Sequence, residues 1–102
     1  MPSPREPTPR RPSKAVLRTV APVGVRRRLT DRRGTAWDVH EDRIPVDEWS
    51  TADVESSQNG YGVGWLVFES DDHRKRLRLY PAAWHQLSDQ ELETLCGRAR
   101  RF

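Results

Sequence analysis

The sequence predicts a small α+β domain, in which two β-hairpins form an antiparallel sheet and one C-terminal helix packs against it. Two stretches alternate apolar and polar residues around a turn, and a third repeats apolar residues at helical spacing. Strands followed by a helix are typical of α+β architecture. A chain of 102 residues allows one domain. We expect this domain to span residues 15–102, after a tail at residues 1–14.

The tail is rich in proline and arginine. Residues 1–14 contain five prolines together with Arg5, Arg10, Arg11 and Lys14, and no apolar side chain beyond Met1. This composition predicts a disordered, partly polyproline segment. The short apolar stretch Ala15–Val20 is either an edge strand or a loose extension.

The first hairpin turns at Asp31-Arg32-Arg33-Gly34. Asp in the first position and Gly in the fourth suit a type I turn followed by a left-handed glycine bulge. The bulge places Leu29 opposite Trp37 and Arg27 opposite Val39. One side of the hairpin then collects Val25, Leu29, Trp37 and Val39, with Arg27 at its margin.

The second hairpin turns at Asp71-Asp72, between the apolar run Trp65–Phe68 and the alternating run Arg74–Tyr80. The predicted register pairs Glu69 with Arg74, Val67 with Arg76, and Trp65 with Arg78. The predicted core face consists of Leu29, Trp37, Val39, Leu66, Phe68, Leu77 and Leu79.

A helix is predicted to begin after Ser88. Ser88 and Glu91 form a capping box, and apolar residues follow at spacings of three and four. We expect the apolar stripe to bury Cys96, and Trp84 to fold over the core. The stripe consists of Leu92, Leu95, Cys96 and Ala99, and basic residues at the helix end are Arg98, Arg100 and Arg101.

Charge is segregated along the chain, whose net charge is +3. Residues 35–72 carry one basic and ten acidic residues, whereas the 34 residues before them carry ten basic and two acidic residues. Within this region, residues 41–62 read as an acidic connecting loop, in which a short helical turn near Val46–Val54 is possible. Such asymmetry suggests either an anionic partner for the basic ends or internal pairing between the ends and the acidic middle. A more specific hypothesis is that the acidic loop screens the basic tail until a polyanion displaces it.

No set of residues has the spacing of a catalytic, metal or cofactor site. The single cysteine, Cys96, excludes an intrachain disulfide, and His40, His73 and His85 lie in three separate segments. No phosphate-binding glycine loop opens a helix. We therefore expect no enzyme activity, metal or cofactor. No apolar run approaches the roughly 20 residues of a membrane helix, so no membrane partner is expected and a cytoplasmic location is the default.

Several segments resemble small bacterial proteins that have no established activity. The likeness lies in the turn and strand from Asp31 to Val39, in Leu66–Ser70 and the arginine-rich strand after it, and in Tyr80-Pro81, Trp84 and Leu87–Leu92. It covers about residues 25–40 and 64–96. The resemblance implies a folded unit and carries no function.

The sequence predicts a binding module for an anionic partner, with nucleic acid favoured over an acidic protein surface. The predicted nucleic-acid-binding residues are Arg74, Arg76, Arg78, Trp65, Arg10 and Arg11. An adaptor that docks on a larger assembly is the alternative, through Trp65, Val67, Arg98 and Phe102. A third interpretation is that the arginines only solvate the outer face of the sheet. The oligomeric state is left open.

Overall fold

The computed structural model describes residues 21–102, which form one five-stranded antiparallel sheet and two α-helices. The α+β class and the antiparallel sheet are therefore confirmed. The strands lie in the order β1-β2-β3-β4-β5, which is also their order along the chain. Their bounds are Arg26–Thr30, Ala36–Arg43, Gly64–Glu69, Arg74–Leu77 and Arg100–Arg101. The predicted tail, with Arg10 and Arg11, and the stretch Ala15–Val20 lie outside the described residues.

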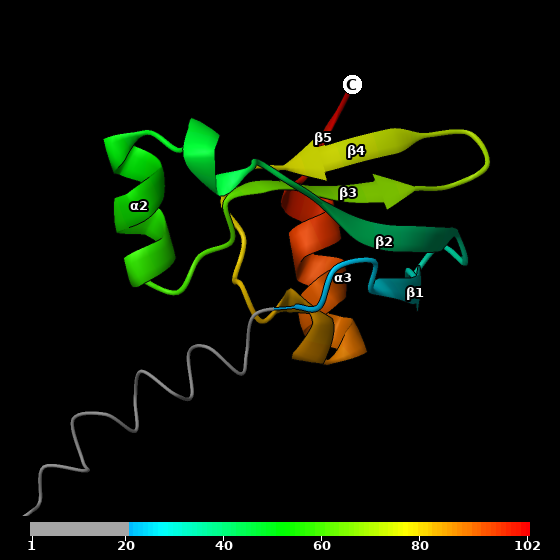
Figure 1. Cartoon of the computed structure of the whole chain (residues 1–102). Helices are drawn as coiled ribbons and strands as arrows, with labels where there is room; N and C mark the ends of the chain where they lie inside the picture. Colours follow the sequence, from blue (N-terminus) through cyan, green and yellow to red (C-terminus); the bar gives the residue numbers. More distant parts are fainter. Residues whose placement is uncertain (1–20) are drawn as a thin grey trace, which may run out of the picture.

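The helix α3 (Asp89–Arg98) covers one face of the sheet, and α2 (Thr51–Gln58) lies beyond one end of it (Figure 1). Two short 3₁₀ turns, Val46–Glu48 and Trp84–Gln86, connect these elements to the strands. The region predicted as a loop with a possible helical turn thus contains a complete helix. Ser50 and Asp53 form a capping box at its start, which satisfies backbone groups that a helix end otherwise leaves unpaired.

The β1–β2 turn has the geometry that its sequence predicts. Gly34 has φ +83°, and the amide of Asp31 donates to the carbonyl of Thr35 at 2.9 Å. The Asp31 carboxylate accepts hydrogen bonds from the amides of Arg33 and Thr35 and from Nε1 of Trp37. Leu29 consequently pairs with Trp37, and both side chains are buried.

The core lies between the sheet and α3. Six of its side chains are essentially inaccessible to solvent, among them Trp84 and Tyr80, which come from the segment between β4 and α3. The capping box of Ser88 and Glu91 starts α3, whose buried residues are Leu92, Leu95 and Cys96. Burial of apolar area on this scale is the main stabilising contribution to such a fold.

Two features differ from the sequence-based prediction. Leu79, predicted in the core, is 49% exposed, because β4 ends at Leu77 and the alternation of faces ends with it. The helix also ends earlier than its basic residues suggest: Ala99 has extended backbone angles, and β5 follows at once and pairs with β4. The description as two hairpins and one helix is therefore incomplete.

Candidate nucleic-acid interface

The face of the sheet that points away from α3 carries a cluster of arginines and two aromatic rings. Glu69 pairs with Arg74 and Val67 with Arg76, as the alternation predicts, while Phe68, which lies between them on β3, is buried in the core. The strand β5 extends the cluster, because Arg100 pairs with Arg76. We call this cluster the outer arginine face; it consists of Trp65, Arg74, Arg76, Arg78, Arg100 and Phe102.

Arg76 lies between the two aromatic rings. Its guanidinium carbon is 4.1 Å from the centre of the Trp65 ring and 4.7 Å from that of Phe102. Arg78 lies 5.3 Å from the Trp65 ring, and Arg74 lies 5.0 Å from the Phe102 ring. Cation–π contacts of this kind favour one orientation of a guanidinium without using its N–H donors. The donors of Arg76 therefore remain available for an anion.

Two of the arginines have carboxylate partners. Arg74 pairs with Glu69 at 3.0 Å, and Arg78 pairs with Asp53 of α2 at 3.2 Å. Hydrogen bonds from Ser50, and then the positive charge of Arg78, lower the pKa of Asp53, so that this partner stays ionised. Both pairs are partly exposed and contribute little to stability.

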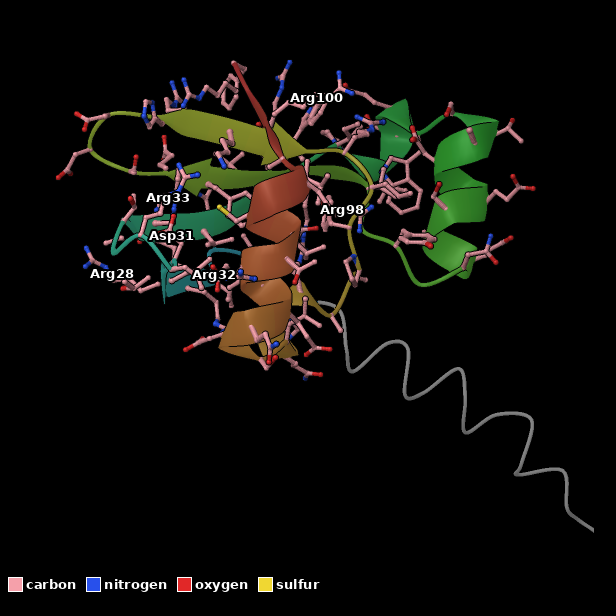
Figure 2. The ribbon with its side chains drawn as sticks, turned by 180° about the vertical axis from the view of Figure 1, so that it is seen from behind. Arg28, Asp31, Arg32, Arg33, Arg98 and Arg100 are labelled. Carbon is pink, nitrogen blue, oxygen red and sulfur yellow. The ribbon has the colours of Figure 1, made fainter. Side chains whose placement is uncertain are left out.

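Arg76, Arg98 and Arg100 form no ion pair with any carboxylate among residues 21–102. Arg98 lies at the end of α3 and Arg100 on the strand beyond it (Figure 2). All three line a depression of about 450 Å³, together with Trp65, Leu79 and Phe102. These three arginines, none of which has a carboxylate partner among residues 21–102, thus meet near the β4–β5 edge of the sheet.

The strand β2 is acidic on the same face. The register of β2 with β3 pairs Asp38 with Glu69 and Asp42 with Trp65, which places these carboxylates on the side of the outer arginine face. Beyond them, at the opposite edge, Arg26 of β1 is exposed and pairs with His40 in the register. A polyanion that crossed the whole sheet would meet the repulsion of β2, so the favourable strip runs along β4 and β5.

The structure brings together most of the residues that the sequence singles out. Trp65, Arg74, Arg76 and Arg78 share one face with Phe102, and Arg98 reaches the same depression. Val67 is only 5% exposed between its neighbours on β2 and β4, which leaves little of it to contact a partner.

Arg100 is the residue that sequence reasoning assigned to a different role. The sequence predicts Arg100 as one of the basic residues at the end of the helix. In the structure, Arg100 belongs to β5 and pairs with Arg76. Ala99 favours a helix and Gly97 weakens it by only about 1 kcal/mol, so the sequence gives little signal that the helix ends before Arg100.

The described part of the chain, residues 21–102, shows neither a group of metal-ligating side chains nor an exposed reactive cysteine. Among residues 21–102, no three His, Cys, Asp or Glu side chains are grouped as metal ligands. Cys96 is buried, and burial raises the pKa of its thiol, which disfavours the reactive thiolate. The helices of residues 21–102 are too short and too polar to span a bilayer.

Comparison with known protein families, curated proteins and solved structures finds no match to this chain.

Proposed function

We propose that the protein is a non-enzymatic binding module that holds nucleic acid on its outer arginine face. The observation that carries this proposal is the position of Arg76, held between Trp65 and Phe102 with no carboxylate partner among residues 21–102. Phosphate oxygens accept hydrogen bonds from guanidinium groups in a bidentate geometry, and a preoriented guanidinium loses less entropy on binding.

The kind of recognition follows from what surrounds Arg76. Arg98 and Arg100 supply further positive charge with no carboxylate partner in the described chain, and the ring of Phe102 is half-exposed. Phosphate contacts position a nucleic acid without reading its sequence, and aromatic rings stack on any base. We therefore expect weak sequence specificity and a steep dependence of affinity on salt.

The test compares the affinity of Arg76→Gln and Arg26→Gln for an oligonucleotide at two salt concentrations. Each variant removes one arginine that has no carboxylate partner in the part of the chain that the structure describes, and both arginines lie on the same sheet face, but Arg26 lies on β1, beyond the acidic strand β2. We expect Arg76→Gln to weaken binding. The slope of log K against log salt should also become less negative by about 0.7, the value for one phosphate contact with a single strand. Arg26→Gln should bind like the wild type.

Two results would reject the proposal. One is the absence of binding by the wild-type protein even at low salt. The other is an equal loss of affinity in Arg76→Gln and Arg26→Gln, which would show that net charge alone, and not this face, decides binding.

A second candidate function is supported by the apolar part of the depression. Leu79 and Phe102 are exposed beside Trp65, which is the composition of a docking site for an acidic protein partner. Binding of this kind depends on the indole more than on salt. Trp65→Phe retains an aromatic platform, whereas Trp65→Ala removes it, so a partner that docks on Trp65 should be lost in the alanine variant at all salt concentrations.

A further inference from the structure

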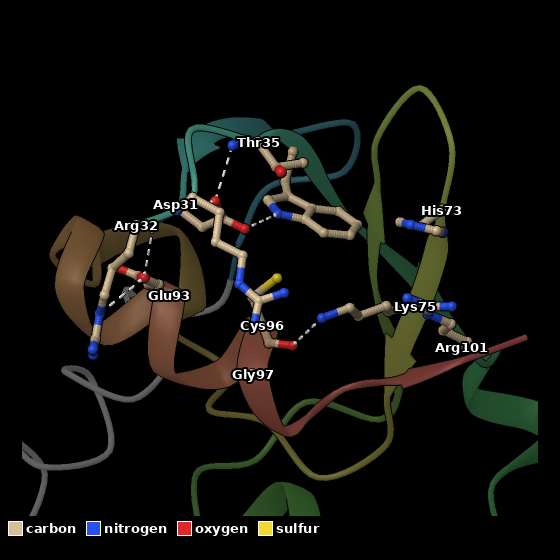
Figure 3. Close-up of a pocket in the computed structure, with 11 residues that line it drawn as sticks. Asp31, Arg32, Thr35, His73, Lys75, Glu93, Cys96, Gly97 and Arg101 are labelled. Carbon is tan, nitrogen blue, oxygen red and sulfur yellow. Dashed lines mark hydrogen bonds and ion pairs between the residues drawn. The ribbon is translucent and has the colours of Figure 1, made fainter.

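A second basic depression lies on the other side of β5, facing α3. It has a volume of about 450 Å³ and opens between the β1–β2 turn, β4 and the end of α3 (Figure 3). Its basic lining residues come from three separate segments of the chain: Arg32 and Arg33 from the turn, Lys75 from β4, and Arg101 from β5.

The two acidic residues of this depression, Asp31 and Glu93, already accept hydrogen bonds within the protein. The Asp31 carboxylate accepts a 3.0 Å hydrogen bond from Nε1 of Trp37 and two more from backbone amides, and these bonds lower its pKa. Glu93 pairs with Arg32 and also accepts from the Arg32 amide. Arg33 and Arg101 form no ion pair with a carboxylate of the described chain.

The negative end of α3 is neutralised as well. Lys75 donates a 3.2 Å hydrogen bond to the carbonyl of Cys96, and the amide of Ala99 donates to the carbonyls of Leu95 and Cys96. Lys75 also lies 4.9 Å from the centre of the Trp37 ring, which fixes its position. What remains unpaired around this depression is therefore the positive charge of Arg33 and Arg101.

The two depressions adjoin at β5. Successive residues of a strand point to opposite faces, so Arg100 faces the outer arginine face and Arg101 the α3 side, and Arg101 lines both depressions. Since β5 is the edge strand of the sheet that residues 21–102 form, no further described strand separates the two sides beyond it.

We infer that the nucleic acid is single-stranded and bends around the β5 edge, with phosphates on both the Arg76–Arg100 side and the Arg33–Arg101 side. The inference rests on the proposed function of the outer arginine face. A single strand is flexible and can follow a groove that turns, whereas a duplex is stiff over the length of a small domain and would contact one side only.

The experiment measures binding of a single-stranded oligonucleotide, and of the duplex of the same sequence, as a function of salt. Arg33→Gln and Arg101→Gln are compared with Arg28→Gln, which removes an exposed arginine from the same hairpin as Arg33 but on the opposite face of the sheet. We expect the single strand to bind more tightly. Arg33→Gln and Arg101→Gln should each make the salt slope for the single strand less negative by about 0.7, and Arg28→Gln should leave this slope unchanged.

The inference and the proposed function fail in different ways. If Arg76→Gln weakens binding while Arg33→Gln and Arg101→Gln bind the single strand like the wild type, the strand does not bend around β5 and the outer face alone binds. Equal affinity for the duplex would also overturn the inference. Absence of binding to either form would overturn both.

Discussion

Tyr80 donates a 2.6 Å hydrogen bond from its hydroxyl to the carboxylate of Glu41, a side chain that is 9% exposed. Glu41 also accepts from Nε1 of Trp84 and pairs with Arg43 at 2.8 Å. Arg43 in turn donates to the carbonyl of Ala21. One carboxylate thus connects β2 to the segment before α3 and to the start of the described chain. The nearly buried charge of Glu41 is tolerated because Tyr80, Trp84 and Arg43 all donate to its carboxylate.

Replacing Glu41 should destabilise the fold. In Glu41→Gln, an amide N–H₂ replaces one acceptor oxygen, which leaves a buried donor unsatisfied at a cost of about 1–3 kcal/mol. Urea unfolding would measure this as a lower midpoint at unchanged slope. Asp42→Asn, an exposed neighbour without these contacts, is the control. Equal midpoints for Glu41→Gln and the wild type would show that the cluster contributes nothing.

Stability should fall at alkaline pH because of Tyr80. Burial, and then the hydrogen bond to Glu41, raise its pKa in the folded protein far above the ordinary value of 10.0. The unfolded chain releases this proton first, so the contribution of Tyr80 is complete below pH 10 and is lost as the pH rises above it. The midpoint of urea unfolding should drop above pH 10. In Tyr80→Phe this alkaline drop should be smaller, and an identical drop would contradict the assignment.

Asp31 should act in the opposite pH range. The hydrogen bond from Trp37, and then those from backbone amides, lower its pKa below 3.8 in the folded state. A lowered pKa stabilises the fold above the unfolded value, and this contribution disappears as the pH falls through the folded one. Asp31→Asn should therefore be less stable than the wild type at pH 7, and the difference should shrink in acid. A constant difference at every pH would attribute the effect to turn geometry and not to charge.

Two glycines should respond to alanine with opposite sign. A Cβ at Gly62 would clash with the Tyr80 ring, which is fully buried, so Gly62→Ala should cost about 1–3 kcal/mol. At Gly97, within α3, a Cβ would meet nothing within 4 Å. Gly97→Ala should stabilise the protein by up to about 1 kcal/mol through helix propensity. Thermal unfolding of the two variants, measured side by side, would test both signs.

The sequence predicts the local features well, because each of them depends on neighbouring residues. The turn at Asp31–Gly34 determines the register of the first hairpin, and the capping box at Ser88 determines where α3 begins. Alternation along β3 and β4 predicts which arginines share a face with Trp65.

The remaining features depend on tertiary contacts. The strand β5 has two residues, both arginine, and offers no alternation to detect. The buried role of Glu41 follows from the parity of Trp37 and Val39 on the same strand, but a carboxylate on a core face is expected only when its partners are known. The capping box of Ser50 and Asp53 was a usable signal for α2 in a region that otherwise reads as a loop.

The acidic strand on the outer face has a consequence for the width of a partner. Adjacent strands lie about 4.8 Å apart, so β2 is only about 10 Å from β4. A protein surface of ordinary interface size, about 800 Å² per partner, is far broader than that and would overlap the carboxylates of Asp38 and Asp42 if it were acidic. A narrower polymer of phosphates, which is the partner that we propose, is expected to follow β4 and β5 with less overlap with these carboxylates. If the outer arginine face binds an anion as proposed, we expect the sheet to discriminate between anions by their breadth as well as by their charge.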